Sequence, residues 1–213
     1  MDGPHGMDDV VAGGAPLAKA KAVVILVHGR GGTAESMLPL ADAFGRNDIA
    51  YLAPQAAGQT WYPKSFLAPI EENEPNLSSA LALLGELIGD LGGKGFPPKR
   101  VGLVGFSQGA CLSTEFVARN ARRYGFVAAL TGGLIGPPAT PRNYTGALDG
   151  TPVFLGSSDV DPHVPLERIH ETTAVLTGLG ATVDERIYPG MGHIVNDDEV
   201  GAVKALLSRL AAD

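Results

Sequence analysis

A serine stands at the centre of a glycine-flanked pentapeptide, Gly-Phe-Ser-Gln-Gly, at residues 105–109. The pentapeptide follows a β-rich run at 100–104 and precedes a helical pattern at 108–121. A Gly-x-Ser-x-Gly sequence between a strand and a helix is typical of a nucleophile elbow, whose turn projects the hydroxyl above the sheet. The positive end of the helix also points toward an oxyanion that develops there. We therefore predict that Ser107 is a nucleophile, and the alternative is a purely structural turn.

A serine hydroxyl is a weak nucleophile and needs a histidine base that a carboxylate orients. In this arrangement of strands and helices the three residues follow the chain order Ser, Asp or Glu, His. Four of the five histidines fit poorly, because they lie in the N-terminal segment, before the serine, inside a predicted helix, or two residues past the best acid: His5, His28, His170 and His163. His193 remains, in a glycine-rich loop directly after the last predicted strand, and we predict that it is the base.

Two aspartates, Asp159 and Asp161, follow a predicted strand at 152–156, where a triad acid is expected. Asp161 precedes Pro162, which fixes the direction of the chain just before the next predicted helix. We favour Asp161 as the acid. Asp159 is the alternative, and its other expected role is to cap the turn.

A second glycine-rich loop, Val-His-Gly-Arg-Gly-Gly at residues 27–32, ends the first strong predicted strand. Glycines there allow a backbone N–H to face the serine and to complete an oxyanion hole with the N–H of Gln108. The loop does not match a phosphate-binding motif, since no Lys-Ser or Lys-Thr pair follows it. We expect His28 to hold the loop through hydrogen bonds.

Three aromatic residues, Trp61, Tyr62 and Phe66, gather in one long loop after a predicted strand at 49–53. They could form the pocket for the acyl or alcohol group of a substrate, or simply pack the loop onto the sheet. Cys111 stands four residues after the serine, in the helix of the elbow, where we expect buried packing and no second nucleophile.

Short β-rich runs alternate with longer helical patterns along most of the chain. We predict strands at 22–27, 49–53, 100–104, 126–131, 152–156 and 182–188, and helices at 34–44, 76–91, 108–121, 165–178 and 197–211. Asn76 is the expected N-cap of the second helix. This alternation indicates an α/β fold with a mostly parallel central sheet and helices on both faces. We predict a flexible or weakly structured N-terminal segment at 1–20 and a single domain at 21–213.

The composition narrows the class of protein. The 213 residues suit one globular domain, and 16 basic against 23 acidic residues give a net charge of −7, which argues against a nucleic-acid partner. One cysteine excludes a disulfide framework, and no His, Asp or Glu pair has metal-ligand spacing, so we expect neither a metal nor another cofactor. The chain has no apolar run of membrane-spanning length and no signal-peptide pattern, so we expect a cytoplasmic protein.

Four motifs together resemble one family. They are His-Gly-Arg-Gly-Gly at 28–32, Gly-Phe-Ser-Gln-Gly at 105–109, Asp-Pro-His-Val-Pro at 161–165 and Gly-Met-Gly-His at 190–193. In this order and spacing they resemble the phospholipase/carboxylesterase family of α/β-hydrolases, small serine esterases that include the acyl-protein thioesterases, and the similarity runs from about residue 20 to the end. The resemblance implies an α/β-hydrolase fold with a minimal core and no large cap domain. It also implies Ser107, Asp161 and His193 as the triad, with oxyanion-hole N–H groups from Arg30 and Gln108.

The first motif departs from the acyl-protein thioesterases, which usually have His-Gly-Leu-Gly-Asp where this chain has Arg30 and Gly32. We therefore expect a serine carboxylesterase that hydrolyses small to medium esters through an acyl-enzyme. The alternatives are a thioesterase or lactone hydrolase on the same scaffold, and a catalytically silent binding protein. The expected partner is a small-molecule ester, with a homodimer as an option. The Arg30 side chain either selects esters with an acidic group or ties down its own loop.

Overall fold

A seven-stranded sheet forms the centre of the computed structural model, which describes residues 3–212. The strands are β1 (Val10–Gly14), β2 (Ala22–Val27), β3 (Ile49–Pro54), β4 (Val101–Phe106), β5 (Phe126–Leu130), β6 (Pro152–Ser158) and β7 (Thr182–Tyr188), in the order β1-β3-β2-β4-β5-β6-β7. All neighbouring strands are parallel except β1, which runs antiparallel to β3. The predicted α/β-hydrolase fold with its mostly parallel sheet is confirmed.

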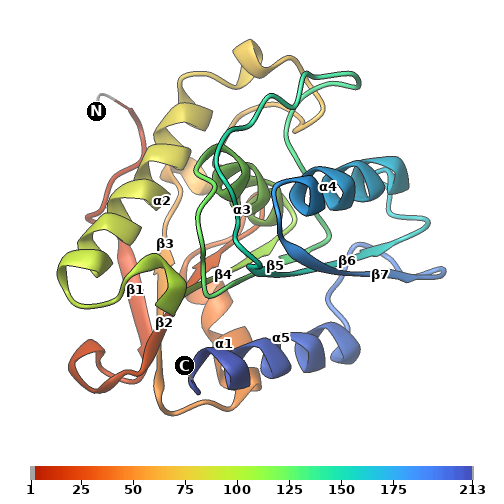
Figure 1. The fold of residues 1–213 in the computed structure, drawn as a ribbon. Coiled ribbons are helices and arrows are strands. Elements are labelled where there is room, and N and C mark those ends of the chain that lie inside the picture. Colours follow the sequence, from red (N-terminus) through yellow and green to blue (C-terminus); the bar gives the residue numbers. More distant parts are fainter. Residues whose placement is uncertain (1–2, 213) are drawn as a thin grey trace.

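Five helices cover the sheet in two layers. They are α1 (Leu38–Phe44), α2 (Asn76–Gly93), α3 (Gln108–Arg119), α4 (Leu166–Gly178) and α5 (Asp197–Leu210). Helices α2, α3 and α4 lie on one face, and α1 and α5 lie on the other (Figure 1). Each face has its own apolar core, one including Leu84 and Ile169, the other Phe44 and Val203. Strand β2 is buried along its whole length because both of its faces are covered, which explains why it reads as an unbroken apolar run.

Two helix starts differ from the sequence prediction. The predicted helix at 34–44 begins as a short 3₁₀ turn, Glu35–Met37, and the α-helix starts only at Leu38, beside Pro39, which has no backbone N–H to donate. The expected N-cap role of Asn76 is wrong, because Asn76 is already helical. The Glu74 carboxylate instead accepts a hydrogen bond from the Ser78 N–H at 3.0 Å, which satisfies one free donor of the first turn.

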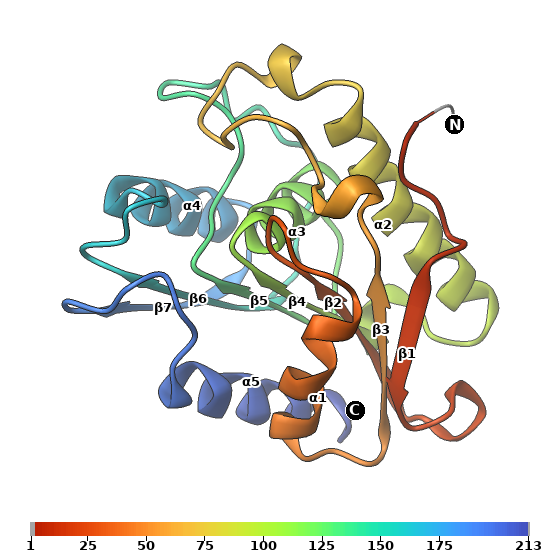
Figure 2. The same cartoon turned by 180° about the vertical axis from the view of Figure 1, so that it is seen from behind.

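The N-terminal segment, predicted at 1–20 to be flexible or weakly structured, contains an edge strand, and its residues 1–2 lie outside the described residues. Residues 10–14 form the edge strand β1, which pairs with β3 over five residues (Figure 2). The side chains of β1 are half-buried or exposed, so its sequence has no apolar periodicity that would predict a strand. Backbone pairing with the open edge of β3 holds it in place. Ahead of this strand, His5 lies against the loop after β3, where its Nδ1 accepts a hydrogen bond from the Ala57 N–H at 3.0 Å.

Two irregular segments lie together beyond the carboxyl ends of the central strands. One is the loop at 55–75 between β3 and α2, and the other is the proline-rich segment at 131–151 between β5 and β6 (Figures 1 and 2). The Gly136 N–H donates to the Phe66 carbonyl at 2.7 Å and joins the two segments. Among residues 3–212, these loops take the place that a cap domain would occupy. None of the helices in that range is long and apolar enough to cross a membrane.

Candidate active site

Ser107 occupies the sharp turn between β4 and α3. Its backbone has φ 53° and ψ −118°, a strained conformation that residues other than glycine rarely adopt. The Ser107 N–H donates to the Leu130 carbonyl at the end of β5, at 2.9 Å, so the neighbouring strand holds the turn in this conformation. The predicted nucleophile elbow therefore has its expected geometry.

Gly105 and Gly109, on either side of the serine, leave no room for a side chain. A Cβ atom at Gly105 would lie 2.3 Å from the carbonyl oxygen of Gly109, and one at Gly109 would lie 2.1 Å from that of Val27. Both distances are far below van der Waals contact. Because these two residues lack a side chain, α3 can start directly against β2 and β4, while Ser107 itself takes the strained backbone angles.

The three predicted triad residues come together from three separate turns. The His193 Nε2 atom lies 2.7 Å from Ser107 Oγ, and His193 Nδ1 lies 2.7 Å from Asp161 Oδ2. Ser107 follows β4, Asp161 follows β6 and His193 follows β7. These strands are parallel, so their carboxyl ends meet at one edge of the sheet.

Asp161 is fully buried, and both of its oxygens have partners. Its Oδ1 accepts hydrogen bonds from the N–H groups of His163 at 2.8 Å and Val164 at 3.0 Å, and its Oδ2 faces His193. Burial works to raise the pKa of the carboxyl, but the hydrogen bonds from His193 and from the two N–H groups outweigh it and leave the pKa below its ordinary value. A charged Asp161 places a proton on Nδ1 of His193, which leaves Nε2 free to accept the proton of Ser107.

Asp159, the alternative acid, has a different partner. Its Oδ1 accepts a hydrogen bond from the Gly190 N–H at 2.7 Å. Gly190 has φ +70° and belongs to the loop that carries His193. Asp159 therefore fastens the histidine loop to the loop of the acid. It does not cap its own turn as expected, because the N–H groups of His163 and Val164 donate to Asp161 instead.

Sequence reasoning passed over two residues that pack against the His193 imidazole. The Phe106 ring lies 5.3 Å from the His193 ring, and the His163 ring meets it edge-on at 4.9 Å. Phe106 is the variable residue before the serine, so its position in the motif already indicated this side of the site. Nothing in the sequence indicated the contact of His163, which the loop after Asp161 brings into place.

The glycine-rich loop after β2 lies against the serine. A Cβ atom at Gly29 would lie 3.3 Å from Cβ of Ser107, so the loop backbone passes directly beside the elbow. Neither the Arg30 N–H nor the Gln108 N–H donates to a backbone carbonyl within residues 3–212. Gln108 is the first residue of α3, where N–H groups lack helical partners. His28 holds the loop as expected, because its buried ring accepts a hydrogen bond from the Ala56 N–H at 3.1 Å.

Comparison with known proteins fits this geometry. A model of the phospholipase/carboxylesterase family matches residues 9–211. The chain belongs to this family. A phospholipase/carboxylesterase from Dyadobacter fermentans, whose crystal structure is known, is 42% identical and superimposes with a TM-score of 0.91 over 95% of this chain and 97% of its own.

The curated relatives are less similar in sequence than this crystal structure. Acyl-protein thioesterase 1 of Gibberella zeae is 34% identical over 54% of this chain and 50% of its own length, and the putative esterase NocK of Nocardia uniformis is 30% identical over 78% and 48%. The chain thus spans about half the length of these two relatives. Acyl-protein thioesterase 1 of Saccharomyces cerevisiae is 24% identical over 92% of this chain and 95% of its own. These relatives place the chain in a family of hydrolases.

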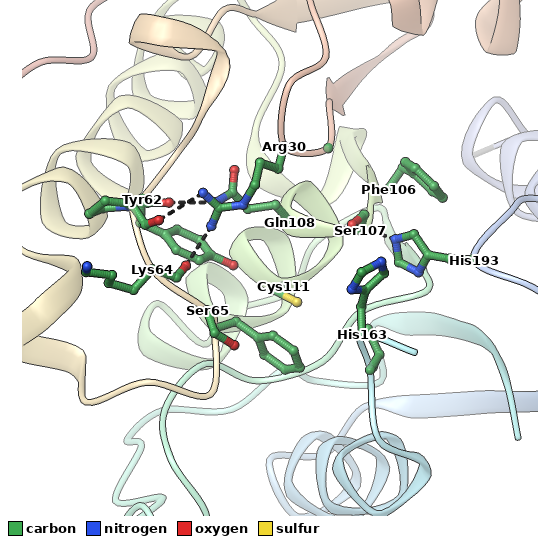
Figure 3. A pocket seen from close by; sticks show the side chains of 14 residues that line it. Arg30, Tyr62, Lys64, Ser65, Phe106, Ser107, Gln108, Cys111, His163 and His193 are labelled. Carbon is green, nitrogen blue, oxygen red and sulfur yellow. Dashed lines mark hydrogen bonds between the residues drawn. The ribbon is translucent and has the colours of Figure 1, made fainter. Parts of the chain in front are cut away.

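In this family member, two long side chains hold the loop at 60–66 beside the serine. The Gln108 side chain accepts a hydrogen bond from the Trp61 N–H at 2.9 Å and donates to the Tyr62 carbonyl at 2.8 Å. The Arg30 guanidinium donates through Nη2 to the Lys64 carbonyl at 2.6 Å (Figure 3). Through Nη1 it donates to Thr60 Oγ1 and to the Pro63 carbonyl, each at 3.0 Å. The tethering role considered for Arg30 is therefore present.

A cavity of about 600 Å³ opens between this loop and the triad. Tyr62 and Phe66 line it, but Trp61 does not. Trp61 takes the packing role that was the alternative for these aromatic residues. Its side chain is fully buried, its ring lies 5.5 Å from that of His5 and 4.9 Å from that of His28, and its Nε1 donates to the His28 carbonyl at 2.8 Å.

The cavity also has lining residues that sequence reasoning did not single out as binding residues: Pro63, Lys64, Ser65, Phe106, His163 and Val164. Their signal was their position, either in the long loop or next to a triad residue. Cys111 reaches the same wall, where burial raises the pKa of its thiol to about 12. A thiol of that pKa stays protonated at neutral pH, which agrees with the packing role expected for it.

Proposed function

We propose that this protein is a serine carboxylesterase that hydrolyses small to medium carboxylic esters through an acyl-enzyme. One observation carries the proposal: Ser107, His193 and Asp161 form an unbroken line of hydrogen bonds, each 2.7 Å long, at the edge of a 600 Å³ cavity. A protein that only binds ligands has no need of a buried carboxylate that orients an imidazole toward a strained serine.

The reaction begins when Nε2 of His193 takes the proton of Ser107 Oγ and the oxygen attacks the ester carbonyl. The negative charge of the tetrahedral intermediate falls on the former carbonyl oxygen, which the free N–H groups of Arg30 and Gln108 stabilise. The intermediate collapses, His193 gives its proton to the departing alcohol, and the acyl group stays on Ser107. A water molecule, deprotonated by His193, then attacks the carbonyl of the acyl-enzyme. The bond between the acyl carbon and Ser107 Oγ breaks, His193 returns its proton to Oγ, and the acid leaves.

Asp161 stays charged during both steps. Its hydrogen bonds with His163 and Val164 fix the carboxylate, and its contact with Nδ1 keeps the imidazole in the orientation that each proton transfer requires. Asp161 stabilises the imidazolium that forms when His193 accepts a proton.

A thioesterase is the second candidate, because the similar proteins of Gibberella zeae and Saccharomyces cerevisiae are acyl-protein thioesterases. The same nucleophile can attack a thioester carbonyl. The polar lining contributed by Arg30, Lys64, Ser65 and His163 favours a compact polar ester over a long acyl chain. Comparing kcat/KM on p-nitrophenyl esters, acyl thioesters and lactones separates these substrate classes.

Covalent labelling tests the serine mechanism directly. A fluorophosphonate probe should label the wild type and should not label Ser107→Ala, whose kcat should fall about 10⁴- to 10⁶-fold. Ser208→Ala, at an exposed position of α5, is the matched control and should be labelled like the wild type. If Ser107→Ala keeps more than a few per cent of the ester hydrolysis, the nucleophile is another residue.

The cytoplasmic location and the homodimer option stay predictions.

A further inference from the structure

The cavity beside Ser107 is cationic although the chain is acidic. The whole chain has a net charge of −7, yet the residues that line the cavity include Arg30 and Lys64 and no aspartate or glutamate. The triad carboxylate is fully buried behind His193, to which it is hydrogen-bonded, so it presents no charged oxygen to the cavity. An anionic group that enters this space meets positive charge and no opposing carboxylate.

Arg30 supplies that charge in a fixed position. A guanidinium has five N–H donors, and three of them are used in the bonds to Thr60, Pro63 and Lys64. Its Nε–H and one Nη2–H have no acceptor within residues 3–212. In Figure 3 the guanidinium bonds to the loop that carries Lys64, away from Ser107 and His193. The tether therefore orients the guanidinium and leaves two donors for a ligand.

The ring of Tyr62 supports the same group. Carbon Cζ of Arg30 lies 5.9 Å from the centroid of this buried ring, within the range of a cation–π contact. A guanidinium that is already ordered loses little conformational entropy when a ligand binds. Its planar fork also matches the two oxygens of a carboxylate.

Lys64 contributes less directly. Lys64 lines the cavity, but in Figure 3 its ammonium group points away from Ser107. Lys64 can therefore add to the field in the cavity but cannot offer the directed contact that Arg30 offers. This difference gives the chain its own control for separating contact from overall charge.

A second cavity of about 350 Å³ shares Gly29, Arg30 and Phe106 with the first and is otherwise lined by residues that include Met37, Leu40 and Val195. Ser107 and His193 line only the first cavity, so a substrate carbonyl at the serine lies in the cavity beside Tyr62 and Phe66.

We propose that the Arg30 side chain selects esters that carry a carboxylate, which it binds through its two remaining donors in the cavity bounded by Tyr62 and Phe66. This assignment rests on the proposed esterase function and adds its substrate class. Arg30 is then a specificity-determining residue whose side chain binds substrate while its backbone N–H serves the oxyanion.

The test compares esters that differ only in charge. One pair has the charge in the acyl half: the 4-nitrophenyl half-ester of adipic acid and its terminal carboxamide. The other pair has it in the alcohol half: the butanoyl ester of 3-(4-hydroxyphenyl)propanoic acid and its carboxamide. We expect the wild type to prefer the carboxylate in at least one pair, measured as a ratio of kcat/KM values, and the preference to weaken as salt is raised.

Arg30→Leu should lower that ratio about 10- to 100-fold, the factor for losing a hydrogen bond to a charged group. Lys64→Met should lower it less than about threefold. The ratio is the readout because loosening the tether changes the rates for both members of a pair. An equal effect of the two variants, an unchanged ratio in Arg30→Leu, or a wild type without preference in either pair would overturn the proposal.

The wild type alone separates failure of this inference from failure of the proposed function. If it reacts with a fluorophosphonate and hydrolyses the carboxamide esters without favouring the carboxylates, the esterase function stands and the selectivity does not. If it neither reacts with the probe nor hydrolyses any of the four esters, the proposed function itself is wrong.

Discussion

The two sides of Ser107 are built in different ways. On one side, the Asp161 and His193 side chains are hydrogen-bonded to each other. Two backbone N–H groups of the neighbouring turn donate to the other oxygen of the Asp161 carboxylate. On the other side, the side chains of Arg30 and Gln108 reach across to the backbone of the loop at 60–66 and hold it by its N–H and carbonyl groups. The first side depends on the identity of each residue. The second depends on two anchoring side chains, those of Arg30 and Gln108. Because their main partners are backbone groups, we expect substitutions within the loop at 60–66 to be better tolerated.

This difference separates catalysis from substrate binding within one small site. A substitution on the triad side removes a partner that no backbone group can replace, so it should act mainly on kcat. A substitution of an anchor loosens a cavity wall while the reacting atoms keep their neighbours, so it should act mainly on KM. The predictions below test this separation.

The largest effect should come from the acid. Asp161→Asn should lower kcat about 10³- to 10⁴-fold, because an amide does not hold the imidazole with its proton on Nδ1. Asp159→Asn is the matched control: it weakens the bond to the Gly190 N–H but leaves the triad intact, so kcat should fall about tenfold or less. Steady-state kinetics of both variants on one activated ester measure this. The reverse order would make Asp159 the acid.

A smaller effect is expected at the anchor. Gln108→Leu leaves the buried Trp61 N–H without a partner and removes one of the two donors to the Tyr62 carbonyl, the other being the Thr60 hydroxyl at 3.1 Å. It should lower stability by about 1–3 kcal/mol. The oxyanion N–H of residue 108 remains, so KM should rise about tenfold while kcat changes less. Kinetics and thermal unfolding together check this. If kcat falls and KM stays constant, the loop belongs to the catalytic side and the separation fails.

The smallest effect concerns a second buried carboxylate on the triad side. Glu199 lies in the first turn of α5, shortly after His193, where it completes a capping box with Asn196. One of its oxygens, Oε1, has no hydrogen-bond partner within the described residues. Burial raises the pKa of Glu199 to about 7, and the hydrogen bond from the Asn196 N–H opposes this only in part. Both carboxylate oxygens of Asp161 accept hydrogen bonds, and its pKa is shifted in the opposite direction, below its ordinary value.

The sign of the pH effect follows from this difference. The unfolded chain ionises Glu199 near its ordinary pKa, so folding favours the protonated form, and stability is lost as pH rises from about 4.5 to about 7. Glu199→Gln keeps a capping-box residue and removes the ionisation. Relative to wild type, it should gain about 2–3 kcal/mol between pH 5 and pH 8, measured by thermal unfolding.

Asp197→Asn serves as the control for this pH effect, since it removes an exposed carboxylate from the same helical turn. It should change the melting temperature by a similar amount at both pH values. A Glu199→Gln variant whose stability runs parallel to wild type from pH 5 to pH 8 would show that Glu199 is already charged at no cost in the folded protein.

Much of the fold could be predicted because it is encoded locally. The apolar run of β2 and the glycine-serine-glycine turn after β4 each carry their own signal within a few residues. The order of Ser107, Asp161 and His193 along the chain then implied their meeting, because parallel strands bring their carboxyl ends to one edge. The strand β1 could be expected only as weak structure, because backbone pairing with β3, and little side-chain burial, stabilises it.

The sequence by itself thus predicted the three residues that the structure brings together as a candidate triad, and the scaffold that carries them. Only the tertiary structure decided the binding side. Trp61 and Tyr62 are adjacent aromatic residues with the same sequence signal, yet the first packs between His5 and His28 while the second lines the cavity. The physical reason is that a long irregular loop has no periodicity to set which way a side chain faces. Contacts with residues far away in the chain make that choice, as they do when Arg30 reaches the carbonyls of Pro63 and Lys64.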